Sequence, residues 1–425
     1  MKKITHLIST VSVAVLFVGG LQITAANAAS KTVVIETDFT GASLNTMQAD
    51  FDHWSVTSHI KVKLNGDTNF ATDIVTQVKT HQTPNLAIWA QPGGLLAQSA
   101  AEVPLESLVN VKKITSQLIP GLSTLAKKNG KTYGLPISLN LKTLLWYNTK
   151  AFKASGYAVP TTYAQLVALS NKIEADGSGY PFCVGGGSGW PLTDWFEQYV
   201  ADLDGTTTYN NWIAGTTKFG SPSIAKAAMA LGELLLKDGA SNGNGTGIAN
   251  DPYNNTAPLF TTGGKAAGQC FMYKQGSFAS GFFPANIQSE ISSGDTTDIN
   301  VTGFPVVTGG KSVTEGGGNT VAAFTKDKST AAVLTYLLSP NFGHIFASDS
   351  FFLSPFKNFD TTYYPNVFRK KFATVLEASK AFVFDASDQM PPAVNTAFGN
   401  EMTSWFGGQE SYAQAAVKID AAYNK

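Results

Sequence analysis

The chain has 425 residues, with 30 Lys and Arg against 30 Asp and Glu, and charged residues make up only 14% of it. A polyanion-binding protein normally shows a basic face, so this balance disfavours nucleic acid as a partner. The 11% of aromatic residues suits a neutral, polyhydroxylated ligand, because sugar rings present apolar faces for stacking and hydroxyls for hydrogen bonds. The length exceeds what one hydrophobic core usually supports, so we expect two lobes.

Residues 1–28 have the pattern of a cleavable secretory signal. Lys2 and Lys3 precede an apolar run over residues 7–21, and Ala-Asn-Ala at 26–28 provides the small residues of a cleavage site. The run is shorter than the roughly 20 residues of a membrane span, and no cysteine at the site could carry a lipid. We therefore expect a secreted or periplasmic protein, or one at the extracytoplasmic cell surface, with a retained, uncleaved anchor as the alternative.

The chain has two cysteines, Cys183 and Cys270. In an oxidising compartment an even pair is most simply one disulfide, and two buried thiols are the alternative. None of the five histidines lies at ligand spacing from another histidine or from a cysteine. We therefore predict no metal site and no cofactor.

Hydrophobic patterning predicts alternating strands and helices along the chain. Strands are expected at 31–36, 60–64 and 86–89, with helices at 44–54 and 70–80 between them, which is the βαβ arrangement of a parallel sheet. Further strands are expected at 133–137 and 143–147, helices at 161–175, 222–237, 329–338 and 412–423, and a loop at 241–262. The helix after Thr162 carries Gln165 at the spacing of a capping box.

Two aromatic segments have the composition of sugar-stacking platforms. Residues 85–94 place Trp89 before Pro-Gly-Gly, and residues 189–197 contain Trp190 and Trp195. These and other segments, in this order, resemble the extracellular solute-binding proteins of carbohydrate ABC transporters, in the maltose and α-glucoside branch (solute-binding protein family 1). The further segments are 36–38, 133–148, 156–162, 270–278, 316–319 and 384–391. The resemblance covers essentially the whole chain after the signal.

The resemblance implies an α/β, two-lobed, periplasmic-binding-protein-like fold of type II, whose hinged interlobe cleft closes over a sugar. The first lobe would combine 31–139 with 306–348, and the second lobe 140–305 with 349–425. The function implied is a monomeric carbohydrate-binding subunit that delivers its sugar to the membrane permease of an ABC importer, and not an enzyme.

Substrate-binding residues follow from the same resemblance. Trp89 and Trp195 match stacking aromatics of the first and second lobe, with Trp190 beside the latter, and Phe278 matches a further stacking position. For Trp89 and Phe278 the alternative is a place in the core. Asp194 is a candidate acceptor for sugar hydroxyls, or else a helix N-terminal residue favoured by the macrodipole.

Polar positions complete the predicted site. Asp38 matches a carboxylate that accepts hydrogen bonds from sugar hydroxyls, and Lys142 lies where relatives place polar cleft groups. Gly317, within Gly316–Gly318, would let the backbone approach a ligand closely, with a surface turn as the alternative. Gln91 stands with Pro92 where maltose-type relatives have a charged residue, which leaves the identity of the sugar open.

A secreted glycoside hydrolase is the alternative function, with Asp194 and Glu197, or Asp385 and Asp388, as its pair of carboxylates. The first pair has the spacing of a solvated helical face, and the second that of turn and cap residues. The sequence contains no nucleophile elbow, no zinc-protease motif and no P-loop. These observations favour a non-catalytic receptor.

Overall fold

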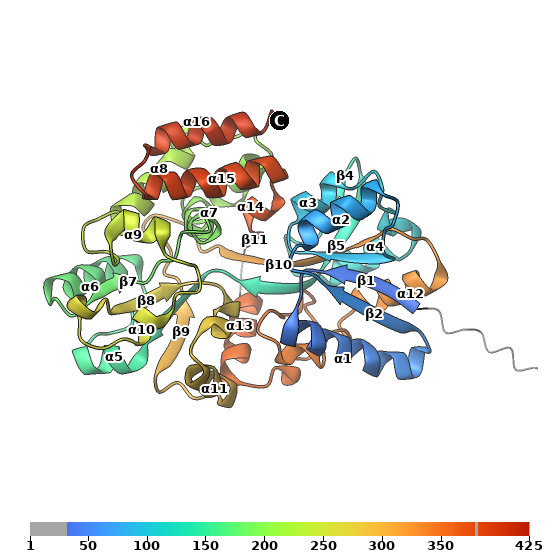
Figure 1. Ribbon diagram of the computed structural model, residues 1–425, viewed down its shortest axis with the longest axis horizontal. Helices are drawn as coiled ribbons and strands as arrows, with labels where there is room; N and C mark the ends of the chain where they lie inside the picture. The colour runs from blue at the N-terminus through green and yellow to red at the C-terminus, as the bar shows by residue number, and fades with distance from the viewer. Residues whose placement is uncertain (1–31, 379–380, 425) are drawn as a thin grey trace, which may run out of the picture.

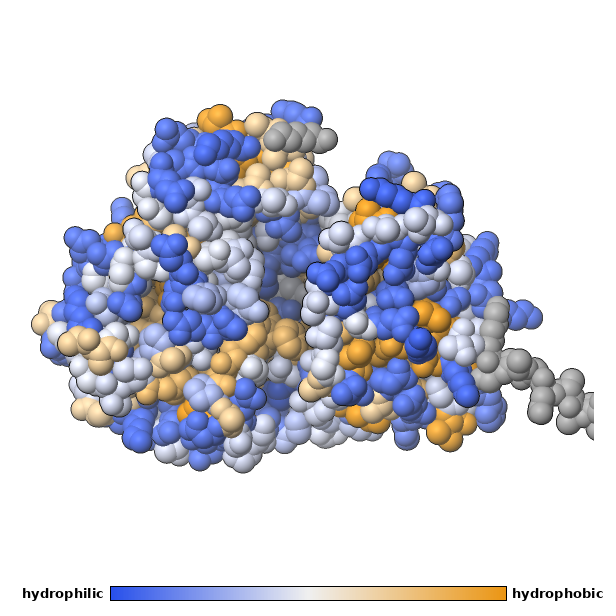
Figure 2. Space-filling model, viewed as in Figure 1, coloured by the Kyte–Doolittle hydropathy of each residue, from blue (hydrophilic) through white to orange (hydrophobic). Residues whose placement is uncertain are grey.

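The computed structural model describes residues 32–378 and 381–424, so the predicted signal at 1–28 lies outside the described residues. Two α/β halves lie side by side, each around its own β-sheet (Figure 1). Figure 2 shows that the surface is hollowed between them. The predicted two-lobed α/β architecture is confirmed.

The sheet of the first half follows the predicted βαβ pattern. Its strands are ordered β2 (Lys61–Gly66), β1 (Thr32–Thr37), β3 (Leu86–Trp89), β10 (Thr314–Ala323), β5 (Lys131–Leu141) and β4 (Ala126–Lys128), and β11 (Phe382–Phe384) pairs with β10. β1 is parallel to both β2 and β3, which confirms the predicted parallel arrangement. The connecting helices are α1 (Gly41–Ser58) and α2 (Phe70–Lys79), and α3 (Pro92–Ala97), α4 (Val111–Gln117) and α12 (Lys328–Leu337) complete this half.

The second half is more helical. Its sheet has the order β7 (Tyr180–Phe182), β8 (Cys270–Lys274), β6 (Leu144–Asn148) and β9 (Ile299–Gly303). Around it lie α5 (Thr149–Ser155), α6 (Tyr163–Ala175), α7 (Trp190–Ile213), α8 (Pro222–Leu235), α11 (Ala285–Ser293), α15 (Pro392–Phe406) and α16 (Tyr412–Ala422). The capping box predicted at the start of α6 is confirmed, because the side chains of Thr162 and Gln165 each accept a hydrogen bond from the other residue's backbone N–H.

The chain passes between the two sheets several times. The passage from β5 to β6 takes only Lys142 and Thr143, and a longer segment joins β9 to β10. After α13 (Val367–Ala378) the chain adds β11 to the first sheet and then returns to the second half through α14 (Ala386–Gln389). The predicted lobe boundaries near 139, 305 and 348 stay a prediction.

One local prediction, the loop at 241–262, and one alternative, the surface turn at Gly316–Gly318, are wrong. The segment 241–262 contains the short helices α9 (Asn244–Asn250) and α10 (Ala257–Phe260), each of which buries one apolar residue, Ile248 or Leu259. Gly316–Gly318 forms part of the buried strand β10 and not a surface turn. A side chain on Gly318 would meet the carbonyl oxygen of Ser138 on β5 at 2.1 Å, and its φ of +152° also favours glycine.

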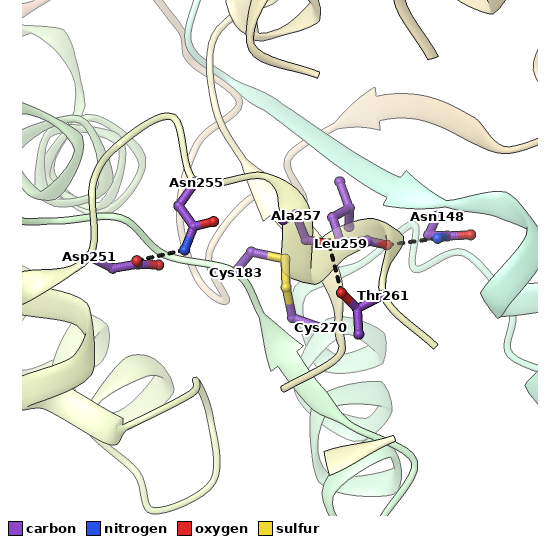
Figure 3. The surroundings of a disulfide bond; sticks show 8 residues. All are labelled: Asn148, Cys183, Asp251, Asn255, Ala257, Leu259, Thr261 and Cys270. Atoms are coloured by element: carbon purple, nitrogen blue, oxygen red, sulfur yellow. Dashed lines mark hydrogen bonds between the residues drawn. A yellow bond between two sulfur atoms is a disulfide. The ribbon is translucent and has the colours of Figure 1, made fainter. Parts of the chain in front are cut away.

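No helix among the described residues is long and apolar enough to cross a membrane. The predicted disulfide is confirmed: Cys183 and Cys270 are bonded, with their Cα atoms 5.5 Å apart. Figure 3 shows the bond where the segment after β7 meets β8. Since β7 and β8 are paired in parallel, the disulfide fixes one edge of the second sheet.

We expect the Cys183→Ala, Cys270→Ala double variant to lose about 2–5 kcal/mol of unfolding free energy. The bond closes a loop with a sequence separation of 87 residues, and a long loop gains much conformational entropy in the unfolded chain when it is opened. Urea unfolding of the oxidised protein and of the double variant would measure the difference. Equal midpoints and slopes would show that the bond contributes no stability.

Candidate functional site

A cavity of about 490 Å³ lies between the two halves. Strands β5 and β10 of the first sheet, helix α7 of the second half and several loops and turns line it. They are Asp38, Phe39, Thr40, Ser43, Ala90, Gln91, Asn140, Lys142, Trp190, Tyr253, Phe278, Phe282, Gly317, Gly318, Asn319, Phe351, Asp385, Ser387, Asp388 and Asn395. Six predicted substrate residues are among them: Asp38, Gln91, Lys142, Trp190, Phe278 and Gly317. Their contact with a ligand stays a prediction.

The first half presents polar groups at the ends of its strands. Asp38 follows β1 and Gln91 follows β3, and the carboxyl ends of parallel strands meet at one edge of a sheet, where ligands commonly bind. The carboxylate of Asp38 accepts a hydrogen bond from the amide of Asn319 at 3.2 Å. Burial raises the pKa of Asp38 to about 6, although its hydrogen bonds act in the opposite direction. Gly317 lines the same side of the cavity and has no side chain to cover its backbone. Its N–H donates a hydrogen bond to Asn140 Oδ1.

Trp89 does not line the cavity and takes its alternative place, in the core. Trp89 is 2% exposed and packs in a separate core cluster, with its ring centroid 5.0 Å from that of Phe70 on α2. The strand β3 is hydrogen-bonded to β1 and β10 and is buried along its whole length, so the last side chain of the strand points toward the covering helices. The first residues beyond the strand, Ala90 and Gln91, reach the cavity instead.

Trp195 also lies away from the cavity, for a related reason. Trp190 is the first residue of α7 and lines the cavity, whereas Trp195 is 1% exposed and packs against Phe182 and Phe304 in the core of the second half. Five residues rotate a side chain by about 140° around a helix, so the two tryptophans face different sides of α7. Asp194 lies on the same side as Trp190, beneath the cavity floor.

Aromatic rings form one wall of the cavity. Trp190 contacts Tyr253 and Phe278, with centroids 5.2 Å and 6.0 Å apart, and Phe278 stacks on Phe351 at 5.6 Å with an interplanar angle of 6°. Phe282 lies against both Tyr253 and Phe278. We name these five side chains the aromatic wall. Sequence reasoning missed Tyr253, Phe282 and Phe351, which stand in loops or short turns without a periodic pattern.

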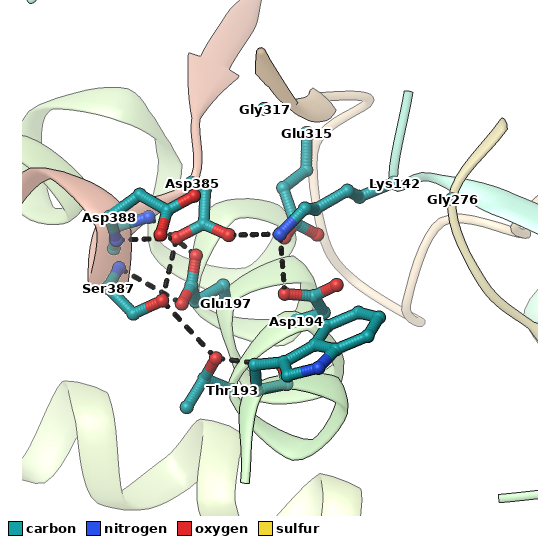
Figure 4. A network of polar contacts seen from close by, with 12 residues as sticks. Lys142, Thr193, Asp194, Glu197, Gly276, Glu315, Gly317, Asp385, Ser387 and Asp388 are labelled. Atoms are coloured by element: carbon teal, nitrogen blue, oxygen red, sulfur yellow. Dashed lines mark hydrogen bonds and ion pairs between the residues drawn. The ribbon is translucent and has the colours of Figure 1, made fainter. Parts of the chain in front are cut away.

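Lys142 lies at the centre of a buried ionic network (Figure 4). Its Nζ donates to Asp194 Oδ1 at 2.9 Å and forms a short contact with Asp385 Oδ2. Burial alone would lower the pKa of Lys142, but the two carboxylates raise it well above its usual value, so the ammonium is charged. The same group lies 5.7 Å from the ring centroid of Trp190, a distance suited to a cation–π contact.

Carboxyl groups outnumber cations in this region. Two lysines are buried there, Lys142 and Lys274, together with five acids: Asp194, Glu197, Asp202, Glu315 and Asp385. Burial, and then the charges of neighbouring carboxylates, raise the pKa values of Glu197 and Glu315 well above their usual range. Burial raises the pKa of Asp194 to about 6 against the opposing charge of Lys142. Asp385 has a lowered pKa, because Lys142 and the hydrogen bonds from residues 387 and 388 outweigh its burial.

The two carboxylate pairs that a hydrolase would use have structural partners. Glu197 accepts hydrogen bonds from the backbone N–H groups of Ala386 and Ser387, so Asp194 and Glu197 are not a solvated face, and that interpretation is wrong. Asp385 accepts from the N–H of Asp388 at 2.8 Å, which confirms the predicted cap chemistry at the start of α14. Within the described part of the chain, no group of His, Cys, Asp or Glu is arranged to hold a metal ion.

Comparisons with known proteins agree with this geometry. The family described as bacterial extracellular solute-binding protein matches residues 41–341. The osmoprotective compounds-binding protein GgtB of Synechocystis is 29% identical over 83% of this chain and 83% of its own length. The α-glucosides-binding periplasmic protein AglE of Rhizobium meliloti is 28% identical over 86% of this chain and 81% of its own. The solved cyclic α-maltosyl-1,6-maltose binding protein of Arthrobacter globiformis has the same fold, with a TM-score of 0.66 at 18% identity over 92% of this chain and 98% of that one.

We expect Lys142→Met to lose about 3–5 kcal/mol of unfolding free energy, because it leaves Asp194 and Asp385 buried without a cation. The matched control is Lys172→Met, which removes an exposed i,i+4 ion pair with Asp176 and should change stability little. Urea unfolding at neutral pH would measure both. Adding Asp194→Asn and Asp385→Asn to Lys142→Met should recover part of the loss. Equal losses for Lys142→Met and Lys172→Met would contradict a central role for Lys142.

Proposed function

This chain belongs to the bacterial extracellular solute-binding proteins, and on that premise we propose that it captures a sugar in the interlobe cavity and delivers it to the membrane permease of an ABC importer. It works as a single copy outside the cytoplasm. The chemistry of the cavity carries this proposal.

One observation matters most: the cavity has rings on one side and hydrogen-bonding groups on the other. The aromatic wall offers flat faces, and the opposite side offers the amides of Gln91, Asn140 and Asn319 with the carboxylate of Asp38. A pyranose ring has apolar faces and hydroxyls around its edge, so it can use both sides together. A cavity of about 490 Å³ is within the usual range for small-molecule sites.

The name of the relative AglE supports a carbohydrate as the ligand. GgtB is named for osmoprotective compounds and AglE for α-glucosides, and both align with more than four fifths of this chain. A glycoside hydrolase is not favoured, because the family is one of binding proteins and because Glu197 and Asp385 hold backbone N–H groups of the α14 turn.

Calorimetric titration against a panel of neutral sugars tests the proposal. The protein, starting at residue 29, would be titrated with glucose, maltose, trehalose, sucrose and longer α-glucans, and each mixture would be analysed for products after prolonged incubation. We expect saturable binding of at least one sugar, recovered intact. Cleaved sugar would favour the hydrolase, and absence of binding across the panel would contradict a sugar receptor.

We expect Trp190→Ala to weaken binding of that sugar by more than about 1 kcal/mol, because it removes a ring of the aromatic wall that packs against both Tyr253 and Phe278. The matched control is Trp405→Ala, which removes a half-buried tryptophan on α15 that does not line the cavity. Titration of both variants, after circular dichroism has shown that they fold, would separate the two sites. Unchanged affinity in Trp190→Ala would remove this ring from the binding surface.

A further inference from the structure

The charges that line the cavity are unevenly distributed. Among the described lining residues, Lys142 is the single cation, while Asp38, Asp385 and Asp388 are carboxylic acids. These four groups come from the end of β1, the passage between β5 and β6, and the turn that begins α14. The lining therefore has more acidic groups than basic ones, although the whole chain has equal numbers of each.

The single cation is already neutralised. Lys142 Nζ is hydrogen-bonded to both Asp194 and Asp385, and its side chain is 9% exposed. An anionic ligand could pair with this ammonium only by displacing one of two buried carboxylates, and the displaced carboxylate would lose its partner. The lining residues that the structure describes therefore offer no free positive charge.

Two carboxylic acids of the lining have no ion-pair partner among the residues that the structure describes. Among the described residues, the side chains that donate hydrogen bonds to the Asp38 carboxylate are the neutral groups of Thr37 and Asn319. A backbone hydrogen bond within Asp38 itself acts in the same direction on its pKa. The carboxyl group of Asp388 accepts no hydrogen bond from any residue that the structure describes. Burial, followed by the negative charge of Asp385, raises the pKa of Asp388 well above its usual value, and Asp194 and Asp38 act in the same direction. A raised carboxyl pKa reports a local environment that disfavours further negative charge.

Resting on the sugar-receptor function proposed above, we propose that this cavity selects its ligands by charge: it accepts neutral sugars and sugars with a protonated amine, and it rejects uronic acids and sugar phosphates. Asp38, whose pKa of about 6 leaves it largely ionised at neutral pH, imposes the rejection of anions, and Asp388 contributes by ionising beside a ligand cation. A ligand carboxylate or phosphate would add negative charge beside them, with Lys142 already engaged. A ligand ammonium would gain a carboxylate partner together with the aromatic wall, whose ring faces also attract cations.

The same geometry links binding to proton release. Where the carboxyl of Asp388 is protonated before binding, a nearby ligand ammonium favours its ionised form, so the proton leaves Asp388 for the buffer as the ion pair forms. A neutral sugar lacks this driving force. Calorimetry in two buffers with different ionisation enthalpies counts protons released, and it should find more for an amino sugar than for its neutral parent.

Isosteric probes separate charge from shape. Glucose, glucosamine, glucuronamide and glucuronate would be titrated at neutral pH, together with the same three substitutions on one ring of trehalose, sucrose and maltose. We expect each uronate to bind at least tenfold more weakly than its uronamide, which has nearly the same shape without the charge. We expect the amino sugar to bind at least as tightly as the neutral parent.

Variants assign the effect to named residues. Asp38→Asn should narrow the difference between uronamide and uronate at least threefold, and Asp388→Asn should abolish the extra proton release that accompanies binding of the amino sugar. Asp52→Asn, which removes an exposed carboxylate from α1 outside the cavity lining, should leave the difference unchanged. Equal affinity for uronate and uronamide in the unaltered protein would overturn the charge selection while the sugar-receptor function stands. Binding of no neutral sugar at all would overturn both.

Discussion

The arrangement of the cavity depends on one buried ammonium group. Lys142 lies in the two-residue passage between β5 and β6, and its Nζ binds carboxylates from α7 and from the residue before α14. A buried cation is tolerated only when it has close partners, so three segments far apart in the sequence must meet at this point. Thr143, the next residue, extends the junction by donating to Gln198 and accepting from the N–H of Glu315 on β10.

This junction explains why so many acids are tolerated near the cavity. Ionising all of them would leave excess negative charge in a region of low polarity, and the raised pKa values of Glu197 and Glu315 show that protonation relieves it. The oxygens of Glu197 also hold the backbone N–H groups that open α14. The acids beneath the cavity therefore position the chain, while groups on the walls remain open to a ligand.

Local patterns in the sequence predicted much of the fold. The βαβ unit up to β3 and the capping box of α6 depend on residues close in the chain, and both are confirmed. Only part of the candidate site could be predicted from such local patterns. Whether Trp89 or Gln91 reaches the cavity depends on where β3 ends and on which face α2 covers, and neither is encoded by the strand's own residues. Trp195 was misplaced because the start of α7 sets which side of the helix faces the cavity.

The remaining site residues could not be found locally, because their meeting is a property of the tertiary fold. Tyr253, Phe282 and Phe351 come from separate irregular segments, and only their packing around Phe278 and Trp190 makes one wall of them. The distribution of charge around the cavity is likewise a property of the tertiary fold. A chain with equal numbers of acidic and basic residues has no net preference for an ion, yet folding can gather one sign at a single surface. Here the pairing of Lys142 with two interior carboxylates removes the only cation among the described lining residues from use, so the cavity's preference is set by which acids remain unpaired.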